Sequence, residues 1–174
     1  MNLRNMNLRC AFDLDDTLLD WWGAYKERFP NSDFTNQGII TRNVRKLQHD
    51  KEFWENLELL EKPNFEPYIY ATKRIIPKSY TRNSLLKHGL PIKPIYQMYY
   101  QHGNKADIIK GRCDVLIDDS YSNVAKAIKS GLPALLIDRP HNQNVKCEFR
   151  IYHLDYDEIL DAYLNELDIL GYAT

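Results

Sequence analysis

The sequence predicts an α/β domain with a parallel sheet of about five strands flanked by helices. Short apolar runs that stop abruptly at polar residues alternate along the chain with helical patterns that stop at glycine. Strands that alternate with helices are typical of βαβ crossovers, which make neighbouring strands parallel. At 174 residues the chain has the length of one compact domain, with room for a small insertion.

Five apolar runs are predicted to be buried strands. They cover residues 8–12, 67–71, 95–100, 115–117 and 133–137, and polar residues follow each of them. In a parallel α/β sheet, ligands bind at the carboxyl ends of the strands. We therefore expect the polar residues at these ends to share one site: Asp13, Thr72, Asp118 and Asp119, with Lys105 at the start of a nearby helix.

Helical patterns fill most of the connections. They cover residues 78–88, 105–110 and 122–130, each closed by a glycine, and residues 155–170 near the end of the chain. The segment between the first two strands, residues 19–66, is too long for one crossover helix and carries its own aromatic residues. We predict that it forms a small helical cap over the strand ends, on a core made of residues 1–18 and 67–174.

Composition excludes several classes of protein. The net charge of −1, from 23 basic and 24 acidic residues, gives no reason to expect a long nucleic acid as partner. Three widely spaced cysteines argue against a disulfide framework or a zinc site. No segment has the length and hydropathy of a signal peptide or membrane span, so we expect a cytoplasmic protein with no membrane partner. The oligomeric state stays open, and a homodimer is one alternative.

The acidic stretch after the first strand has the residues of a phosphate-transfer site. Asp13 and Asp15 lie two residues apart, so one carboxylate can face phosphorus while the other lies beside the leaving oxygen. A carboxylate that attacks an anionic phosphate needs a cation to offset the repulsion, and Mg²⁺ suits an all-oxygen site. Asp118 and Asp119 can supply further ligands, Lys105 a second positive charge and Thr72 a hydroxyl donor.

Simpler explanations exist for each of these residues taken alone. An acidic stretch is most often a solvated turn, and a single lysine or threonine is most often a surface residue or a helix cap. A calcium-binding loop of the EF-hand type is excluded by position, because Leu18 stands where glycine is needed and Ala24 where glutamate is needed. Their common place at strand ends is what favours a functional site.

The motifs resemble those of the haloacid dehalogenase superfamily. Residues 12–18 (FDLDDTL) are similar to its first motif, DxDx(T/V), and Thr72, Lys105 and residues 117–119 to its second, third and fourth. The resemblance implies a Rossmann-like fold and a nucleophilic Asp13. Family phosphatases have aspartate two residues later, which implies that Asp15 is the general acid and base and that its main-chain oxygen binds Mg²⁺.

A closer similarity is to the 5′(3′)-deoxyribonucleotidases, which implies a nucleoside monophosphate as substrate. It rests on residues 28–30 (RFP), 53–57 (FWENL) and 141–143 (HNQ). Trp21 stands where that family has an aromatic residue that stacks on the base. Lys73 and Arg74 depart from the pattern, since a second hydroxyl residue often follows the motif threonine, and we expect Lys73 to bind phosphate with Thr72 and Lys105.

Three alternatives to a nucleotidase remain at the level of sequence. The substrate could be another small phosphate ester or the 3′ end of a nucleic acid, and the domain could bind a phosphorylated ligand without catalysis. The presence of both Asp13 and Asp15 argues against a binding domain, which has no use for an acid–base carboxylate. The aromatic residues of the segment, including Trp21, could instead form only the core of the cap.

Overall fold

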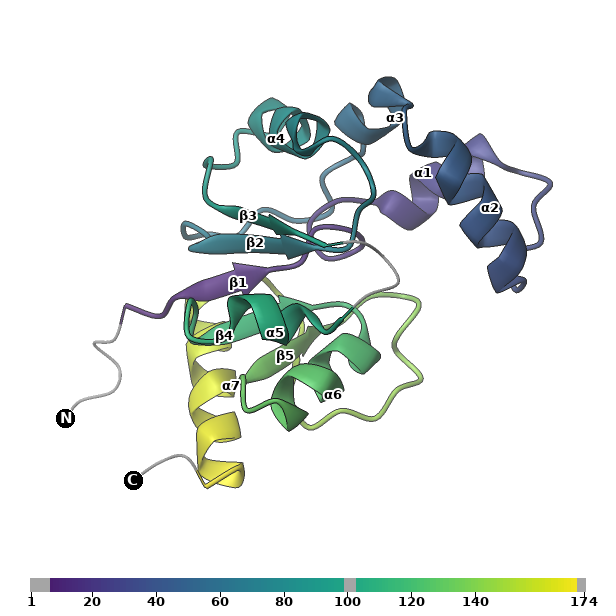
Figure 1. Cartoon of the computed structure of the whole chain (residues 1–174). Helices are drawn as coiled ribbons and strands as arrows, with labels where there is room; N and C mark the ends of the chain where they lie inside the picture. Colours follow the sequence, from purple (N-terminus) through teal and green to yellow (C-terminus); the bar gives the residue numbers. More distant parts are fainter. Residues whose placement is uncertain (1–6, 99–102, 172–174) are drawn as a thin grey trace.

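The computed structural model describes residues 7–98 and 103–171, so the last two residues of the predicted third strand lie outside it. Its six strands form one parallel sheet in the order β3-β2-β1-β4-β5-β6, with helices on both faces (Figure 1). The strands are β1 (Cys10–Phe12), β2 (Ile69–Thr72), β3 (Ile95–Gln97), β4 (Val115–Asp118), β5 (Ala134–Ile137) and β6 (Arg150–Ile151). The predicted parallel α/β fold is confirmed.

The sixth strand is an addition to the five that the sequence predicts. β6 has only two residues, and it extends the sheet beyond β5, to which it pairs in parallel. Leu136 N donates to Phe149 O at 2.8 Å and Asp138 N donates to Ile151 O at 2.8 Å. A two-residue strand contains too little sequence to show a periodic pattern, so its position depends on pairing with β5.

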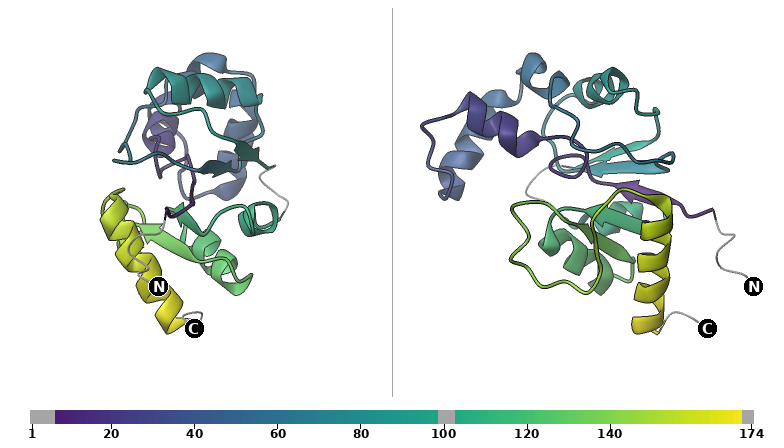
Figure 2. Two further views of the ribbon diagram at one scale, coloured as in Figure 1. Left: turned by 90° about the vertical axis from the view of Figure 1, so that its left-hand side faces the viewer. Right: turned by 180° about the vertical axis from the view of Figure 1, so that it is seen from behind.

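The two faces of the sheet are covered by different helices. Alternate residues of a strand point to opposite faces, so Cys10 and Phe12 belong to one apolar cluster while Ala11 belongs to the other. The first cluster includes residues of α4 (Lys78–Lys87) and α7 (Tyr156–Ile169), and the second includes residues of α5 (Lys105–Ile109) and α6 (Tyr121–Lys129). Figure 2 shows α7 in front when the molecule is seen from behind.

The helices begin and end close to the positions that the sequence signals predict. Gly89 and Gly131, which follow α4 and α6, have φ angles of +63° and +78°, in the left-handed region that favours glycine. The carboxylate of Asp155 caps α7 by accepting from the main-chain N–H groups of Asp157 and Glu158. These caps satisfy main-chain groups at the ends of the helices.

Residues 19–66, the segment predicted to form the cap, contain three helices: α1 (Trp21–Arg28), α2 (Gln37–Leu47) and α3 (Lys51–Glu55). In Figure 1 they lie beyond the carboxyl ends of the strands, with α3 beside α4. Trp21, Trp22 and Tyr25 of α1 stack on one another with ring centroids 5.1 to 5.7 Å apart. Stacked rings of this kind stabilise the packing of a small segment.

The sequence predicts neither a membrane-spanning helix nor a disulfide framework. Across residues 7–98 and 103–171, no helix combines the length and hydropathy needed to cross a membrane. Cys10, Cys113 and Cys147 are all free thiols, and the first two are buried in the core.

Candidate active site

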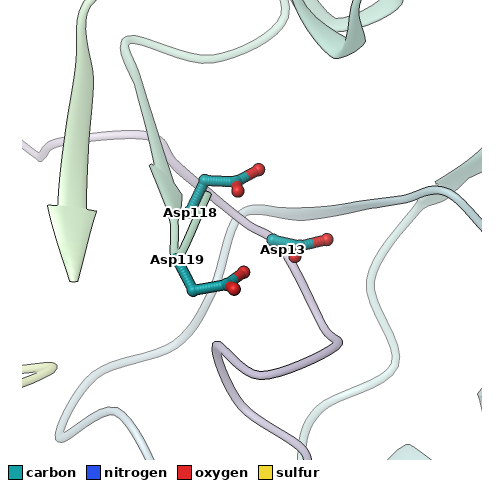
Figure 3. Close-up of side chains that lie close together, drawn as sticks. All are labelled: Asp13, Asp118 and Asp119. Atoms are coloured by element: carbon teal, nitrogen blue, oxygen red, sulfur yellow. The ribbon is translucent and has the colours of Figure 1, made fainter. Parts of the chain in front are cut away.

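Three carboxylates meet at the carboxyl ends of the two central strands, β1 and β4, between which the strand order changes direction. Asp13 follows β1, Asp118 ends β4 and Asp119 follows it. The main-chain N–H of Asp13 donates to Ile117 O at 2.9 Å, which continues the pairing of the two strands past their ends. Each of the three residues has a carboxylate oxygen within 4.8 Å of the others, and Figure 3 shows the side chains pointing to the same side of the loops.

Lys105 lies at the start of α5 and bridges two of these carboxylates. Its Nζ lies 2.5 Å from Asp13 Oδ1 and 2.7 Å from Asp118 Oδ2, and the residue is only 2% exposed. Burial alone would lower the pKa of Lys105, but the negative charges of Asp118 and Asp13 outweigh that effect and raise it. The amine is therefore a permanent positive charge inside the site.

One lysine does not neutralise three buried carboxylates. Burial raises the pKa of Asp13 well above its ordinary value; Lys105 opposes this shift, and the neighbouring carboxylates add to it. Burial also raises the pKa of Asp118, again against the effect of Lys105. Three oxygen donors with excess negative charge fit a hard divalent cation, so the residues present suit Mg²⁺.

The two adjacent aspartates of the fourth motif have different partners. Asp118 accepts from Lys105 Nζ, from Ser120 N at 2.9 Å and from Asn123 Nδ2 at 3.0 and 3.2 Å. Within residues 7–98 and 103–171, the side chain of Asp119 has two polar partners, Thr17 Oγ1 at 3.2 Å and His141 Nε2 at 2.8 Å. Both oxygens of each carboxylate thus have a partner, but Asp118 has three, one of them the positively charged Lys105, whereas Asp119 has two. Asp119 is therefore the less occupied of the two carboxylates.

Two of the predicted phosphate-binding residues, Thr72 at the end of β2 and Lys73 directly after it, lie beside this cluster. The buried Thr72 hydroxyl lies 3.5 Å from Asp15 Oδ2. Lys73 Nζ donates to Asn123 Oδ1 at 2.8 Å, and burial, reinforced by the charge of Lys105, lowers the pKa of Lys73. The structure therefore brings the polar residues that follow β1, β2 and β4 to one edge of the sheet.

Asp15, the predicted acid–base carboxylate, has a partner that the sequence analysis did not identify. Arg74 donates from Nη2 to Asp15 Oδ1 at 2.5 Å and from Nε to the two oxygens at 3.1 and 3.0 Å. The Arg74 side chain is fully buried, whereas that of Asp15 is 22% exposed. The one sequence signal was a basic pair, Lys73 and Arg74, directly after the second motif.

The loop after Asp15 is tight and held from a distant part of the chain. Asp16 has a φ of +60°, and its carboxylate accepts from Trp22 N at 2.8 Å. Burial raises the pKa of Asp16 to about 7. Arg139, which follows β5, donates to Asp16 O at 3.3 Å and Thr17 O at 2.8 Å and pairs with Glu61 at 3.1 Å. Arg139 therefore connects the loop after β1 to the end of the segment predicted to form the cap.

A cavity of about 430 Å³ lies beside this loop, and one of its lining residues, His141, contacts Asp119 through Nε2 at 2.8 Å. It is lined by Asp16, Asp20, Trp22, Gly23, Lys26, Leu60, Arg139, Pro140 and His141. Trp22 lines this cavity, whereas Trp21, which the sequence analysis predicts to stack on the base, does not. The stacking role of Trp21 stays a prediction. Trp21 stacks on Trp22 and Tyr25, and Lys26 Nζ lies 5.2 Å from the centre of the Trp22 ring.

Comparison with solved structures gives the fold. No protein-family model matches the sequence, and no curated protein sequence matches it significantly. A haloacid dehalogenase-like hydrolase from Streptococcus pneumoniae matches with a TM-score of 0.51 and 16% identity, over 96% of this chain and 98% of its own. An L-2-haloacid dehalogenase matches with a TM-score of 0.52 and 13% identity, over 91% and 98%. A further dehalogenase matches at 0.50 and 13%, over 85% and 94%. The chain has the haloacid dehalogenase-like fold.

Proposed function

We propose that the chain is a Mg²⁺-dependent phosphomonoesterase that uses Asp13 as its nucleophile and acts on a nucleoside monophosphate. The observation that supports this most is the meeting of Asp13, Asp118, Asp119 and Lys105 at one edge of the sheet, with a second carboxylate, Asp15, two residues after the nucleophile. A phosphoryl transfer uses each of these groups.

Asp13, Asp119 and the main-chain oxygen of Asp15 would hold Mg²⁺, with Asp118 in a supporting place. The hydrogen bonds support this assignment, because the oxygens of Asp118 already have three partners, Lys105, Ser120 and Asn123, whereas those of Asp119 have two. The ion would supply the positive charge that lets an anionic phosphate approach an anionic carboxylate. Lys105 would add a second positive charge beside the transferring group.

Asp13 and Asp15 account for both halves of the proposed reaction. A carboxylate oxygen of Asp13 forms a bond to phosphorus while the bond to the leaving oxygen breaks, and Asp15 donates its proton to the leaving alkoxide. In the second half, water attacks phosphorus, Asp15 takes a proton from that water, and the bond between Asp13 and phosphorus breaks. The products are an alcohol and inorganic phosphate, and both aspartates return to their starting states.

Asp15 is the reason to propose a phosphatase rather than a dehalogenase, although two of the structural neighbours are dehalogenases. A halide ion is a weak base and leaves without a proton, so dehalogenation has no use for a second carboxylate beside the nucleophile. An alkoxide is a strong base and leaves with a proton, which a neighbouring carboxylic acid supplies.

A nucleoside is the leaving group that best suits the cavity beside the catalytic loop. The volume of about 430 Å³ lies within the range of small-molecule sites, and Trp22 provides aromatic surface in its wall. Base stacking on an aromatic side chain contributes ~1 to 3 kcal/mol. Trp21, the residue proposed from the resemblance, would support Trp22 from behind or contact the base itself.

A hydrolysis screen tests the proposal. The panel contains ribo- and deoxyribonucleoside monophosphates, glycerol phosphate and p-nitrophenyl phosphate, each with Mg²⁺ and with a chelator. We expect Mg²⁺-dependent release of phosphate, fastest with a nucleotide, and no turnover by Asp13→Asn. Asp161→Asn, at an exposed position of α7, is the matched control. Hydrolysis that survives in a folded Asp13→Asn variant, or no hydrolysis of any ester, would contradict the proposal.

A further inference from the structure

Arg74 is a buried charge to which the proposed reaction gives no task. Its side chain is 0% exposed, and removing a guanidinium from water costs several kcal/mol unless it is well paired. It follows β2 by two residues and so lies at the same edge of the sheet as the carboxylate cluster. A residue buried at this cost beside a candidate active site calls for a specific role.

The guanidinium of Arg74 donates hydrogen bonds to one carboxylate, that of Asp15. Nε and Nη2 form three contacts of 2.5 to 3.1 Å with the two carboxylate oxygens, the fork geometry that arginine makes with carboxylates. Thr72 Oγ1 lies 3.5 Å from Oδ2 of the same carboxylate. Residues that follow or end β2 therefore fix the orientation of a side chain carried by the loop after β1.

The opposite side of the guanidinium also has partners. Nη1 donates to Thr81 Oγ1 at 3.3 Å, and Thr81 Oγ1 donates to Gln97 Oε1 at 3.3 Å. The guanidinium carbon lies 5.1 Å from the ring centre of Trp54, a buried residue of α3. Trp54 is itself held by a hydrogen bond of 2.8 Å from Nε1 to Leu47 O. Arg74 is thus a rigid link between the segment of residues 19–66 and Asp15.

We propose that Arg74 is the positioning residue of Asp15: it holds the acid–base carboxylate in the orientation that reaches the leaving oxygen. The inference rests on the proposed function. A free aspartate side chain rotates about two bonds, and proton transfer requires it to stay within hydrogen-bond reach of the reacting oxygen. Fixing that geometry in advance removes an entropic part of the barrier. Lysine cannot replace arginine here, since it lacks the planar fork.

Direct binding of the substrate phosphate by Arg74 is the competing role, and the contacts argue against it. The donors Nε and Nη2 are engaged by Asp15, and Nη1 is engaged by Thr81. With no exposed surface on the side chain, a phosphate has no direct approach to the guanidinium. The two roles differ in what they predict, because a phosphate contact affects KM for every ester whereas a positioning role affects proton transfer.

A double-mutant cycle separates the roles. Arg74→Lys, Asp15→Asn and the double variant are assayed with p-nitrophenyl phosphate, whose leaving group needs little protonation, and with an alkyl ester, a deoxynucleoside 5′-monophosphate. We expect Arg74→Lys to lower kcat for the alkyl ester ~10-fold or more and for the aryl ester far less, within the range of general acid catalysis. KM should change by no more than about twofold, since no contact with the substrate is lost.

The cycle has a second expected result. In the Asp15→Asn background, Arg74→Lys should cause no further loss, because a residue that acts only through Asp15 has no effect once that carboxylate is gone. Thr81→Val removes the hydrogen bond that Arg74 Nη1 donates to Thr81 Oγ1, with little change in side-chain volume. It should also lower kcat for the alkyl ester, by a smaller factor than Arg74→Lys. Arg82→Lys, at an exposed position of α4, is the control and should leave both rates unchanged.

The results that would overturn the inference differ from those that would overturn the proposed function. A wild-type protein that hydrolyses no phosphomonoester removes the proposed function and the inference with it. An active wild-type protein with additive losses in the cycle, or with equal losses for the two esters, removes the inference alone. A raised KM with unchanged kcat would assign Arg74 to phosphate binding instead. Should Arg74→Lys not fold, the same comparisons apply to Thr81→Val.

Discussion

Thr17 and Asp119 exchange two hydrogen bonds through a single hydroxyl group. Asp119 N donates to Thr17 Oγ1 at 3.1 Å, and Thr17 Oγ1 donates to Asp119 Oδ1 at 3.2 Å. The two residues are 102 positions apart in the sequence and both are buried. One side chain of the loop after β1 therefore orients the carboxylate that we assign to Mg²⁺, which gives Thr17 of the first motif a specific physical role.

Replacing that hydroxyl should destabilise the protein. Thr17→Val keeps the shape of the side chain but leaves a buried N–H and a carboxylate oxygen without their partner, which costs ~1 to 3 kcal/mol. Urea unfolding monitored by circular dichroism measures the loss. Thr17→Ser, which keeps the hydroxyl, is the control and should lie closer to the wild type; equal stabilities of the valine and serine variants would show that these hydrogen bonds contribute little.

Mg²⁺ should raise the melting temperature, because an ion that binds only the folded state stabilises it by mass action. At a concentration about 100 times Kd the gain is ~2.7 kcal/mol. Asp119→Asn should abolish most of this gain, whereas the exposed control Asp161→Asn should retain it. Differential scanning fluorimetry with and without Mg²⁺ reads the shift directly. If Mg²⁺ raises the melting temperature of Asp119→Asn as much as that of the wild type, Asp118 would become the proposed metal ligand instead.

Stability should fall as the pH rises from about 4.5 to about 7, and Glu166 should be one cause. This buried residue of α7 accepts from Ala134 N at 3.0 and 3.1 Å, and burial raises its pKa from 4.5 to about 7. A carboxyl group whose pKa is raised by folding contributes its full stabilisation below the pKa that it has in the unfolded state. That contribution is lost as the pH rises through the pKa of the folded state. The full effect is ~3 kcal/mol.

The variant Glu166→Gln removes this titration while keeping an oxygen acceptor for Ala134 N. The free energy of unfolding should therefore change less between pH 5 and pH 8 in Glu166→Gln than in the wild type, as urea unfolding at several pH values measures. Glu148→Gln, at an exposed site, is the comparison and should follow the wild-type curve. Parallel curves for all three proteins would exclude Glu166 as the cause.

Trp22 should contribute to nucleotide recognition. Trp22→Leu removes aromatic surface from the wall of the cavity, so KM for a nucleoside monophosphate should rise several-fold or more, in line with ~1 to 3 kcal/mol for a stacked base. The KM for p-nitrophenyl phosphate, which has no base, should change little. Trp21→Leu is measured beside it. A larger nucleotide-specific effect in Trp21→Leu would assign the stacking role to Trp21, as the sequence analysis predicts, and equal effects on both esters would make the pair structural.

The sequence predicts most of the sheet and the members of the central cluster because both depend on short-range signals. A buried parallel strand is a continuous apolar run, and the residue after it lies at the ligand edge, so the positions of Asp13 and Asp118 follow from the pattern alone. The same logic fails for β6, whose two residues form a strand only because β5 lies beside them.

The partners of the site residues could not be predicted, because they depend on how side chains meet across the fold. Nothing in the sequence around Arg74 indicates that its guanidinium lies between Trp54 and Asp15, 20 and 59 positions away. The choice between Trp21 and Trp22 is of the same kind. Neighbours on a helix point about 100° apart, so which indole lines the cavity depends on how α1 is placed, in part by the hydrogen bond from Trp22 N to Asp16.

The hydrogen bonds of Arg139 have a consequence for the order in which the protein assembles. Its guanidinium holds the carbonyl groups of Asp16 and Thr17 across 123 and 122 positions. Contacts this far apart in sequence form late, since they wait for the intervening chain to fold. During synthesis, the loop after β1 emerges before β5 and lacks this support until β5 and Arg139 have left the ribosome. A growing chain is therefore expected to gain Mg²⁺ affinity only after Arg139 has been translated.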